Sequence, residues 1–182
     1  MSARPAADLA HVVPARPADR QRVGEIAALT GAFNPEEVHT ALELFDGYLR
    51  DAAGTGYNFL AYYDPDTGQM QGYVCWGLTS LSKGAADLFW LATDPAAQGR
   101  GIAAALFRAA EAAARAAGRW VLMLYTSSSP AYARARRLYI REGYQLAMQI
   151  AGFYDRGDDL CVYVKYLDAQ PAAPVALGPG EQ

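Results

Sequence analysis

Two glycines stand between an apolar stretch and a long helical pattern near the middle of the chain. The stretch at 86–93 is almost wholly apolar, as expected of a strand buried on both faces. The pattern over 99–117 predicts a helix that ends at Gly118. A helix start offers unpaired N–H groups and a partial positive charge, and residues without a Cβ let a ligand approach the backbone closely. The connection therefore predicts an anion site suited to a pyrophosphate, in the segment Asp94-Pro95-Ala96-Ala97-Gln98-Gly99-Arg100-Gly101-Ile102-Ala103.

Chain length and composition indicate one globular domain. The 182 residues are 52% apolar and 19% charged, and we expect the domain at 9–168 between Ala/Pro/Gly-rich tails at 1–8 and 169–182. A net charge of −3, with acidic residues scattered among the arginines, predicts no nucleic-acid partner. There is no membrane-length apolar run and no signal-peptide pattern, so we expect a cytoplasmic protein without a membrane partner. Cys75 and Cys161 lie far apart without a CxxC motif, which predicts neither a disulfide nor a metal site.

Apolar periodicity outlines the remaining elements. A turn at 64–68 makes a hairpin of its flanking strands, and a loop at 155–159 precedes the last strand. Glu111 is expected to pair with Arg115 on the polar face of the helix at 99–117. Strand–helix–strand units in the second half predict an α/β (α+β) fold, with a mixed sheet of about seven strands and helices on both faces. The predicted strands are 9–13, 58–63, 71–77, 86–93, 119–125, 144–150 and 160–167, and the predicted helices are 17–28, 35–52, 99–117 and 130–142.

The glycine segment fits one phosphate-binding motif better than two others. The P-loop string GxxxxGK[ST] does not occur. Gly99-x-Gly101-x-x-Ala104 fits the dinucleotide fingerprint, but the intervening Asp-Pro-Ala-Ala-Gln separates the glycines from the strand end. A dinucleotide-binding oxidoreductase therefore stays an alternative. The third motif, [RQ]-x-x-G-x-[GA], is matched at every specified position by Gln98-Gly99-Arg100-Gly101-Ile102-Ala103.

The chain resembles the GNAT superfamily of N-acetyltransferases over residues 9–167. The resemblance rests on this motif and on the segment at 135–144, which is similar to the pattern A-x-x-LY-x-x-x-G[FY] of the superfamily. The resemblance implies a GNAT fold with a V-shaped splay between 86–93 and 119–125. It implies an acyltransferase that uses acetyl-CoA and no metal, and that moves the acetyl group to a primary amine by direct attack in a ternary complex. The acceptor is then a small-molecule or peptide amine. Dimers are common in the superfamily, so the resemblance leaves a homodimer open.

The resemblance also implies roles for individual residues. Tyr139 is the expected general acid toward the departing thiolate, or else an aromatic residue that packs its helix on the sheet. Asp87, eleven residues before Gln98, is the expected base for the amine, directly or through water, or else a strand-edge carboxylate. One backbone N–H in the strand before the cradle is expected to polarise the thioester carbonyl. The expected cofactor contacts are Leu91, Ala92 and Thr93 with pantetheine, and Gln98, Gly99, Arg100, Gly101, Ile102 and Ala103 with the pyrophosphate.

One position departs from the family pattern. Many relatives carry an asparagine seven residues before the tyrosine, where this chain has Tyr132, so Tyr132 and Ser128 with its neighbouring serines are the expected cofactor contacts there. The acidic residues at 155–159 could attract a cationic amine or solvate a turn. Arg100 and the arginines at 134–141 could contact the CoA 3′-phosphate or line a solvated face. A non-catalytic acyl-CoA sensor that docks a partner is the alternative function.

Overall fold

Seven strands form one mixed sheet in the order β1-β2-β3-β4-β5-β7-β6 in the computed structural model, which describes residues 7–168. Among these strands β4 and β5 pair in parallel, and all other neighbours pair antiparallel. Residues 1–6 of the expected N-terminal tail and all of the expected tail at 169–182 lie outside the described part. The strands are β1 (Val12–Pro14), β2 (Tyr57–Tyr63), β3 (Met70–Leu78), β4 (Ala85–Thr93), β5 (Val121–Ser127), β6 (Gln145–Asp155) and β7 (Asp158–Tyr166).

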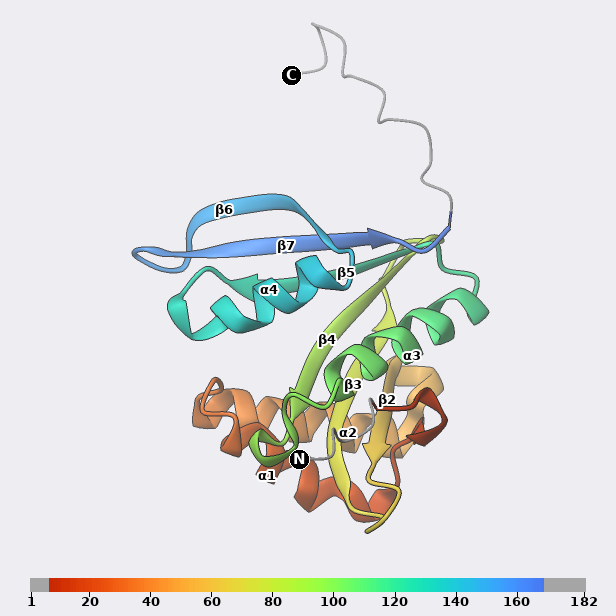
Figure 1. The fold of residues 1–182 in the computed structure, drawn as a ribbon. Coiled ribbons are helices and arrows are strands. Elements are labelled where there is room, and N and C mark those ends of the chain that lie inside the picture. Colours follow the sequence, from red (N-terminus) through yellow and green to blue (C-terminus); the bar gives the residue numbers. More distant parts are fainter. Residues whose placement is uncertain (1–6, 169–182) are drawn as a thin grey trace, which may run out of the picture.

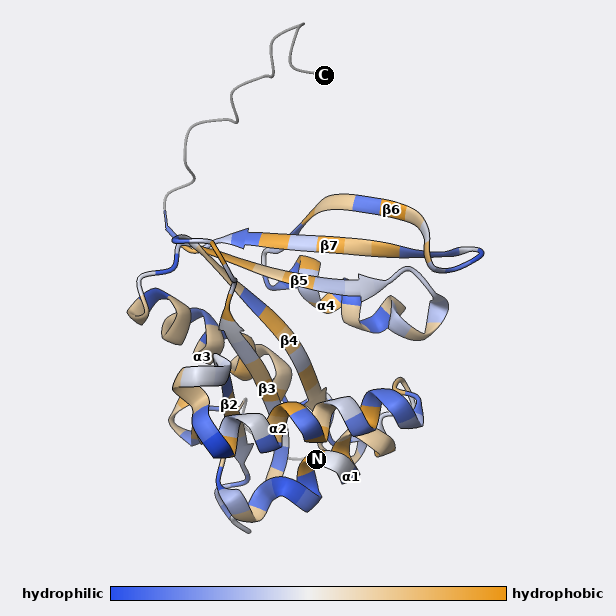
Figure 2. Ribbon diagram, turned by 180° about the vertical axis from the view of Figure 1, so that it is seen from behind, coloured by the Kyte–Doolittle hydropathy of each residue, from blue (hydrophilic) through white to orange (hydrophobic). Residues whose placement is uncertain are grey.

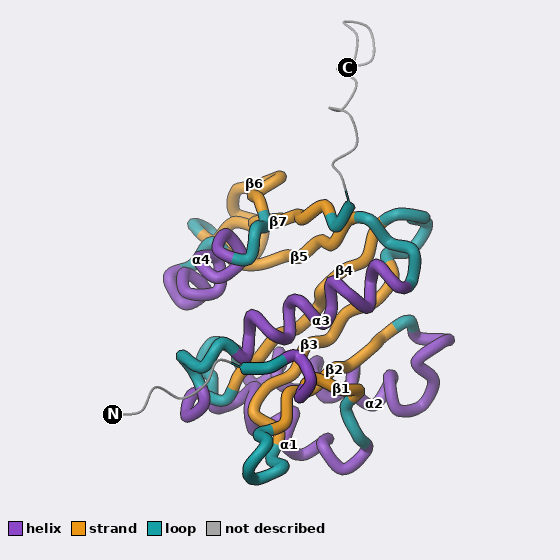
Figure 3. Tube along the Cα trace, turned by 45° about the vertical axis from the view of Figure 1, so that its right-hand side comes forward, coloured by secondary structure: helices purple, strands orange, loops and turns teal. Residues whose placement is uncertain are grey.

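Helices cover both faces of the sheet, as predicted. α1 and α2 lie on one face of the β1–β4 half, α3 lies on the opposite face, and α4 lies beside β5 and β7 (Figures 1 and 3). No helix in the described range 7–168 has the length and apolar character needed to span a bilayer. The helices are α1 (Arg20–Leu29), α2 (Pro35–Thr55), α3 (Ile102–Ala116) and α4 (Ala133–Arg141), with short 3-10 turns η1 (Leu9–His11), η2 (Pro17–Asp19), η3 (Pro95–Ala97) and η4 (Pro130–Tyr132).

The start of α2 is fixed by a reciprocal cap. The Glu37 N–H donates to Asn34 Oδ1 at 2.9 Å, and the Asn34 N–H donates back to Glu37 Oε2 at 2.7 Å. Pro35 occupies the first helical position, where its missing N–H costs nothing. The cap sets the direction in which α2 leaves the loop after α1, so that Ala41 and Phe45 are buried against the sheet.

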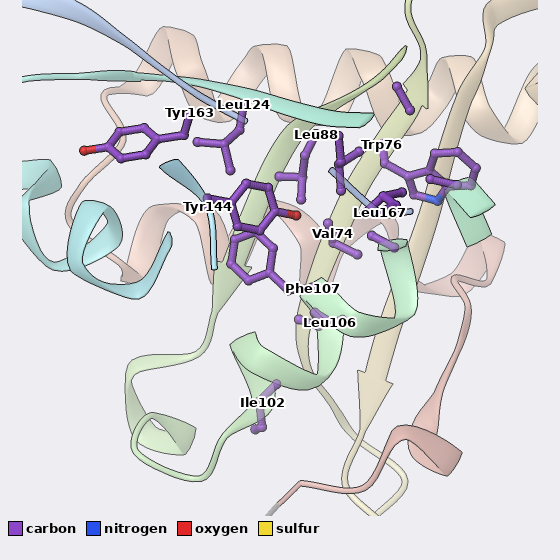
Figure 4. Packing of buried hydrophobic residues seen from close by; sticks show 14 of the residues in the cluster. Val74, Trp76, Leu88, Ile102, Leu106, Phe107, Leu124, Tyr144, Tyr163 and Leu167 are labelled. Carbon is purple, nitrogen blue, oxygen red and sulfur yellow. The ribbon is translucent and has the colours of Figure 1, made fainter. Parts of the chain in front are cut away.

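Two apolar clusters form the core, one on each face of the sheet. The first lies between the sheet and α3 and includes Val74, Leu88 and Phe107 (Figure 4). The second lies beneath α1 and α2 and includes Phe45 and Phe59, whose rings meet edge to face at 4.9 Å. Full burial of each such side chain stabilises the fold by about 1.5–3 kcal/mol. Figure 2 shows the matching apolar stretches along β4, β5 and β7.

Several predicted details were wrong, each for a local physical reason. Residues 9–11 form a 3-10 turn capped by Asp8 rather than part of a strand. The helix after the glycines begins at Ile102, because Gly99 and Gly101 both have φ of 80°. Strand pairing extends through Asp155 and Asp158, so the predicted loop at 155–159 is a tight turn instead.

The predicted surface pair within α3 was also wrong. Glu111 is only 4% exposed, and its carboxylate pairs with Lys165 on β7 at 2.7 Å. Arg115 instead donates to the Leu167 carbonyl. The spacing of residues along the helix could not reveal the pair of Glu111 with Lys165, because Lys165 comes from the distant strand β7.

Candidate functional site

The sheet divides where β4 and β5 stop pairing. Their parallel register runs from Ala85 opposite Val121 to Leu88 opposite Leu124 and ends there. Figure 1 shows the two strands diverging beyond this point. A cavity of about 1370 Å³ occupies the splay, large enough for an extended ligand of cofactor size. Its walls come from the loop between α1 and α2, from β4 and β5, from the start of α3, and from η4 and α4.

A β-bulge lies at the same point of β4. Trp76 pairs with Leu88 and Cys75 with Trp90, so Phe89 is an extra residue without a partner on β3. Such bulges bend a strand and re-aim its groups, and they recur beside active sites. Beyond Leu88, no described strand pairs with the β5-facing edge of β4. Backbone groups of Leu91, Ala92 and Thr93, all of which line the cavity, are therefore available to pair with an extended ligand.

The glycine segment forms one end of the cavity. The first helical bond of α3 runs from the Ala105 N–H to the Gly101 carbonyl at 3.0 Å, which leaves three preceding N–H groups without a helical acceptor. Each residue of the predicted cradle except Arg100 lines the cavity: Gln98, Gly99, Gly101, Ile102 and Ala103. Orphan amides at a helix start attract an anion, which supports the predicted site.

The side chain of Arg100 turns away from this cradle. Its guanidinium pairs with the Asp64 carboxylate at 3.1 Å and donates to Gln71 Oε1 at 2.8 Å. Only the backbone of Arg100 is left to meet a ligand. Arg134 on α4 points the other way, because it lines the cavity and donates to Gln98 Oε1. Arg134 and Gln98 therefore bridge α4 and the start of α3 across the cavity.

Tyr139 projects from α4 into the same cavity. Its ring meets Phe107 of α3 at 5.8 Å and Tyr163 of β7 at 5.5 Å, both edge to face. Burial raises the pKa of Tyr139 to about 12, so the phenol keeps its proton at neutral pH. The two expected roles are thus compatible, since the side chain both packs its helix and offers a proton to the cavity.

Asp87 lies just outside the cavity, on the paired part of β4. It is 8% exposed, and burial raises the pKa of its carboxyl while hydrogen bonds oppose the rise. Its Oδ1 lies 3.5 Å from the Tyr125 hydroxyl, and Tyr125 does line the cavity. Tyr125 was not among the predicted site residues, because an aromatic residue at a strand end gives no catalytic signal. The two side chains form a polar link from the cavity to a buried carboxylate.

The serines after β5 tie the loop to β7. The Ser128 N–H donates to Asp158 Oδ1 at 3.1 Å, and the Ser128 hydroxyl accepts from the Asp159 N–H at 2.8 Å. The polar groups of Ser128 are therefore engaged within the protein. Arg136 holds the same loop through the carbonyls of Ser127 and Ser129. This arginine has a structural role rather than a free surface position.

Tyr132 lines the cavity where η4 meets the start of α2. Its hydroxyl donates to Glu37 Oε1 at 3.1 Å, and its ring lies 6.4 Å from that of Phe33. Phe33 in turn packs on Trp90 at 5.3 Å. Glu37 and Phe33 were missed at the sequence level, because a capping-box glutamate and a loop phenylalanine each have a sufficient local explanation. No group of three His, Cys, Asp or Glu side chains within residues 7–168 is arranged to hold a metal.

The chain resembles a known protein family and several solved structures. Residues 55–146 match the family model of the acetyltransferase (GNAT) domain. A GNAT-family protein from Desulfovibrio desulfuricans is 34% identical, with a TM-score of 0.82 over 86% of this chain and 98% of its own. The yncA protein of Salmonella typhimurium, solved with its cofactor acetyl-CoA, is 22% identical, with a TM-score of 0.67 over 91% and 98% of the two chains.

A third structure has the same fold at low identity. An aminoglycoside 6′-N-acetyltransferase complexed with coenzyme A is 11% identical, with a TM-score of 0.69 over 88% of this chain and 98% of its own. No curated protein matches the sequence.

Proposed function

The chain belongs to the GNAT acetyltransferase family, and from this we propose that it transfers the acetyl group of acetyl-CoA to a primary amine. The observation that carries the proposal is the splay between β4 and β5, with orphan helix amides at one end and an unpaired strand edge along one wall. A pyrophosphate fits the first feature and an extended pantetheine arm fits the second.

The residues around the cavity match the chemistry of acetyl-CoA. Amides of residues 101–104 would hold the pyrophosphate, with Arg134 as a nearby cation. The edge of β4 at Leu91–Thr93 would pair with pantetheine, and an N–H beside the bulge would polarise the thioester carbonyl. Thr93 at the end of β4 lines the cavity, and its buried hydroxyl has no hydrogen-bond partner among the described residues, which is consistent with a polar ligand group beside it.

Acetyl-CoA supplies an acetyl group activated as a thioester, so the reaction exchanges a carbon–sulfur bond for a carbon–nitrogen bond. The attacking ammonium must first lose a proton. Asp87 would accept it through Tyr125, which passes its own hydroxyl proton to the carboxylate as it takes one from the amine. The raised pKa of Asp87 makes this carboxylate a better base than an ordinary one.

Tyr139 would protonate the departing thiolate. Its pKa of about 12 keeps the phenol protonated over the working range of pH. A thiolate released into the same apolar surroundings is destabilised by the same burial and so becomes a stronger proton acceptor. Positioning of the amine supplies the rest of the acceleration, because the two reactants are held in one cavity.

Isothermal titration with acetyl-CoA, with NADH as a control, tests the cofactor. We expect saturable binding of acetyl-CoA alone and, with an amine panel, release of free thiol. Absence of acetyl-CoA binding by folded protein would overturn the proposal, and so would binding without thiol release for any amine. Binding of NADH would instead favour a dinucleotide-binding oxidoreductase.

Replacement of Tyr139 by phenylalanine tests the general acid. We expect kcat to fall by about a hundredfold, in line with the usual contribution of a positioned acid, while the affinity for CoA changes little. The phenylalanine keeps the ring that packs on Phe107, so the fold should survive. Full turnover in the folded variant would remove Tyr139 from the mechanism.

A further inference from the structure

The cavity carries opposite charges at its two sides. Where α4 faces the start of α3, its lining includes Arg134, whose guanidinium donates to Gln98 Oε1, and Arg141, together with Glu142, which pairs with Arg108. Where η4 meets α2 and β7 begins, its lining includes the carboxylates of Glu37 and Asp158. Within residues 7–168 neither carboxylate forms an ion pair. This side of the cavity therefore carries two carboxylates that lack a salt-bridge partner among the described residues.

Glu37 has unused capacity to bind a donor. One carboxylate oxygen accepts from the Asn34 N–H at 2.7 Å and the other from the Tyr132 hydroxyl at 3.1 Å. A carboxylate offers about four lone-pair sites, so about two stay available. The two existing bonds fix the carboxylate in place without neutralising its charge. A fixed carboxylate binds a cation at a smaller cost in side-chain entropy than a mobile one.

A row of aromatic rings begins at this carboxylate, because Tyr132 contacts Glu37 and its ring neighbours Phe33. Phe33 packs between Trp90 at 5.3 Å and Tyr132 at 6.4 Å, and all three residues line the cavity. Aromatic faces attract ammonium groups, most strongly where water is excluded. Rings beside a carboxylate thus suit an alkylammonium group, whose methylenes contact the rings while its charge meets Glu37. An acceptor that carries its own carboxylate, such as a free amino acid, would be repelled by Glu37 and Asp158.

We propose that the acceptor is a polycationic aliphatic amine, of which one amino group is acetylated while a second stays charged and binds Glu37 amid the rings of Phe33, Trp90 and Tyr132. This inference rests on the proposed acetyl transfer. Glu37 is a specificity-determining residue in this scheme and takes no part in proton transfer. The required chemistry is shared by linear polyamines and by aminosugar antibiotics.

A matched pair of acceptors isolates the second charge. 1-Aminopentane and 1,5-diaminopentane have the same chain and differ by one amino group. With thiol release as the readout, we expect kcat/KM for the diamine to exceed that for the monoamine by about 10–100-fold, the range for a hydrogen bond to a charged group. Equal values for the two would overturn the inference. A linear triamine and an aminoglycoside in parallel arms identify the source of the polycation by the higher kcat/KM.

Two neighbouring glutamates supply the variants. Glu37→Gln keeps one acceptor oxygen for the Asn34 N–H, and its NH2 group can donate to the Tyr132 hydroxyl, which then accepts instead of donating, so the cap of α2 survives. It should lower kcat/KM for the diamine about tenfold more than for the monoamine. Glu36→Gln removes an exposed charge from the same helical turn and should change neither value. An unchanged diamine preference in Glu37→Gln, or a preference for a neutral dipeptide amine over the diamine, would overturn the assignment.

These experiments distinguish a failure of the proposed acetyl transfer from a failure of the proposed cation-binding role of Glu37. If no acceptor releases thiol, or if the wild-type protein does not bind CoA, acetyl transfer itself is wrong. If thiol is released equally from all amines, transfer stands and the cation-binding role of Glu37 is wrong. CoA affinity measured on Glu37→Gln checks that the cavity remains intact in the variant.

Discussion

An alanine at Gly101 tests the cradle with the least added bulk. Gly101 caps α3 with φ of 80°, and a Cβ there would meet nothing closer than the Ala7 nitrogen at 3.7 Å. Left-handed backbone costs a residue with a Cβ roughly 1–2 kcal/mol. For a chain of this length that loss lowers Tm by about 2–8 °C. The cost is conformational, because the site has room for the methyl group.

The same strain should weaken CoA binding. Relief of the strain rotates the Gly101 backbone and turns the first N–H groups of α3 away from the pyrophosphate. Loss of one hydrogen bond to a charged group costs about 1.5–3 kcal/mol, which corresponds to about 10–150-fold in affinity. Isothermal titration of the variant with CoA measures the affinity, and urea unfolding measures the stability.

Gly118→Ala is the matched control. Gly118 has φ of 74°, follows the opposite end of α3, and leaves open space for at least 4 Å around an added methyl group. It should lose similar stability while its CoA affinity stays at the wild-type value. Equal losses of affinity in both variants would show that strain acts globally, and an undiminished affinity in Gly101→Ala would show that the amides do not bind the cofactor. Either result refutes the argument.

Four further substitutions probe packing, charge and proton transfer. Phe107→Ala should lower the free energy of unfolding by about 3–5 kcal/mol and should also reduce kcat. Phe45→Ala in the second cluster should lower the free energy of unfolding by a similar amount without changing kcat. Urea unfolding measures the stability of each variant, and thiol release measures its kcat. Burial alone would raise the pKa of Asp64, but hydrogen bonds from a guanidinium and two backbone N–H groups lower it to about 2. The stabilisation by this carboxylate is therefore full above its ordinary pKa of 3.8 and is lost as pH falls toward 2. In Asp64→Asn, the urea midpoint should therefore depend less on pH between about pH 4 and pH 2 than it does in the wild-type protein. Tyr125→Phe should lower kcat with CoA affinity retained, and a full kcat would remove the proposed proton link to Asp87.

The sequence could predict the elements whose signals are local. The alternation of strands and helices and the turn residues between them gave the correct order of elements, since each signal depends on residues close in the chain. The glycine cradle was recognisable because its backbone geometry requires glycine at Gly99 and Gly101. Its amides then follow from helix geometry alone. Family membership is confirmed by the comparisons.

The acceptor side could not be predicted, because it is assembled from distant segments. Glu37 reaches Tyr132 across 95 positions of sequence. Each residue has a sufficient local explanation, as a helix cap or as an aromatic in a turn, so neither signals a site alone. Arg100 shows the same limit, since the sequence left open whether its side chain contacts the CoA 3′-phosphate or solvent, and in the fold it pairs with Asp64 in the hairpin turn after β2.

The width of the cavity depends on side-chain packing more than on the sheet. β4 and β5 share only four residue pairs, so the two halves of the sheet are held at their angle chiefly by what lies between them. Phe107 on α3 meets Tyr139 on α4 and also Tyr144, which precedes β6 (Figure 4 shows Phe107 against Tyr144). This cluster sets the distance from the cradle to the proposed acid. Substitutions in the first cluster should therefore change catalysis and stability together, whereas substitution of Phe45 or Phe59, which lie beneath α1 and α2 and do not line the cavity, should change stability alone.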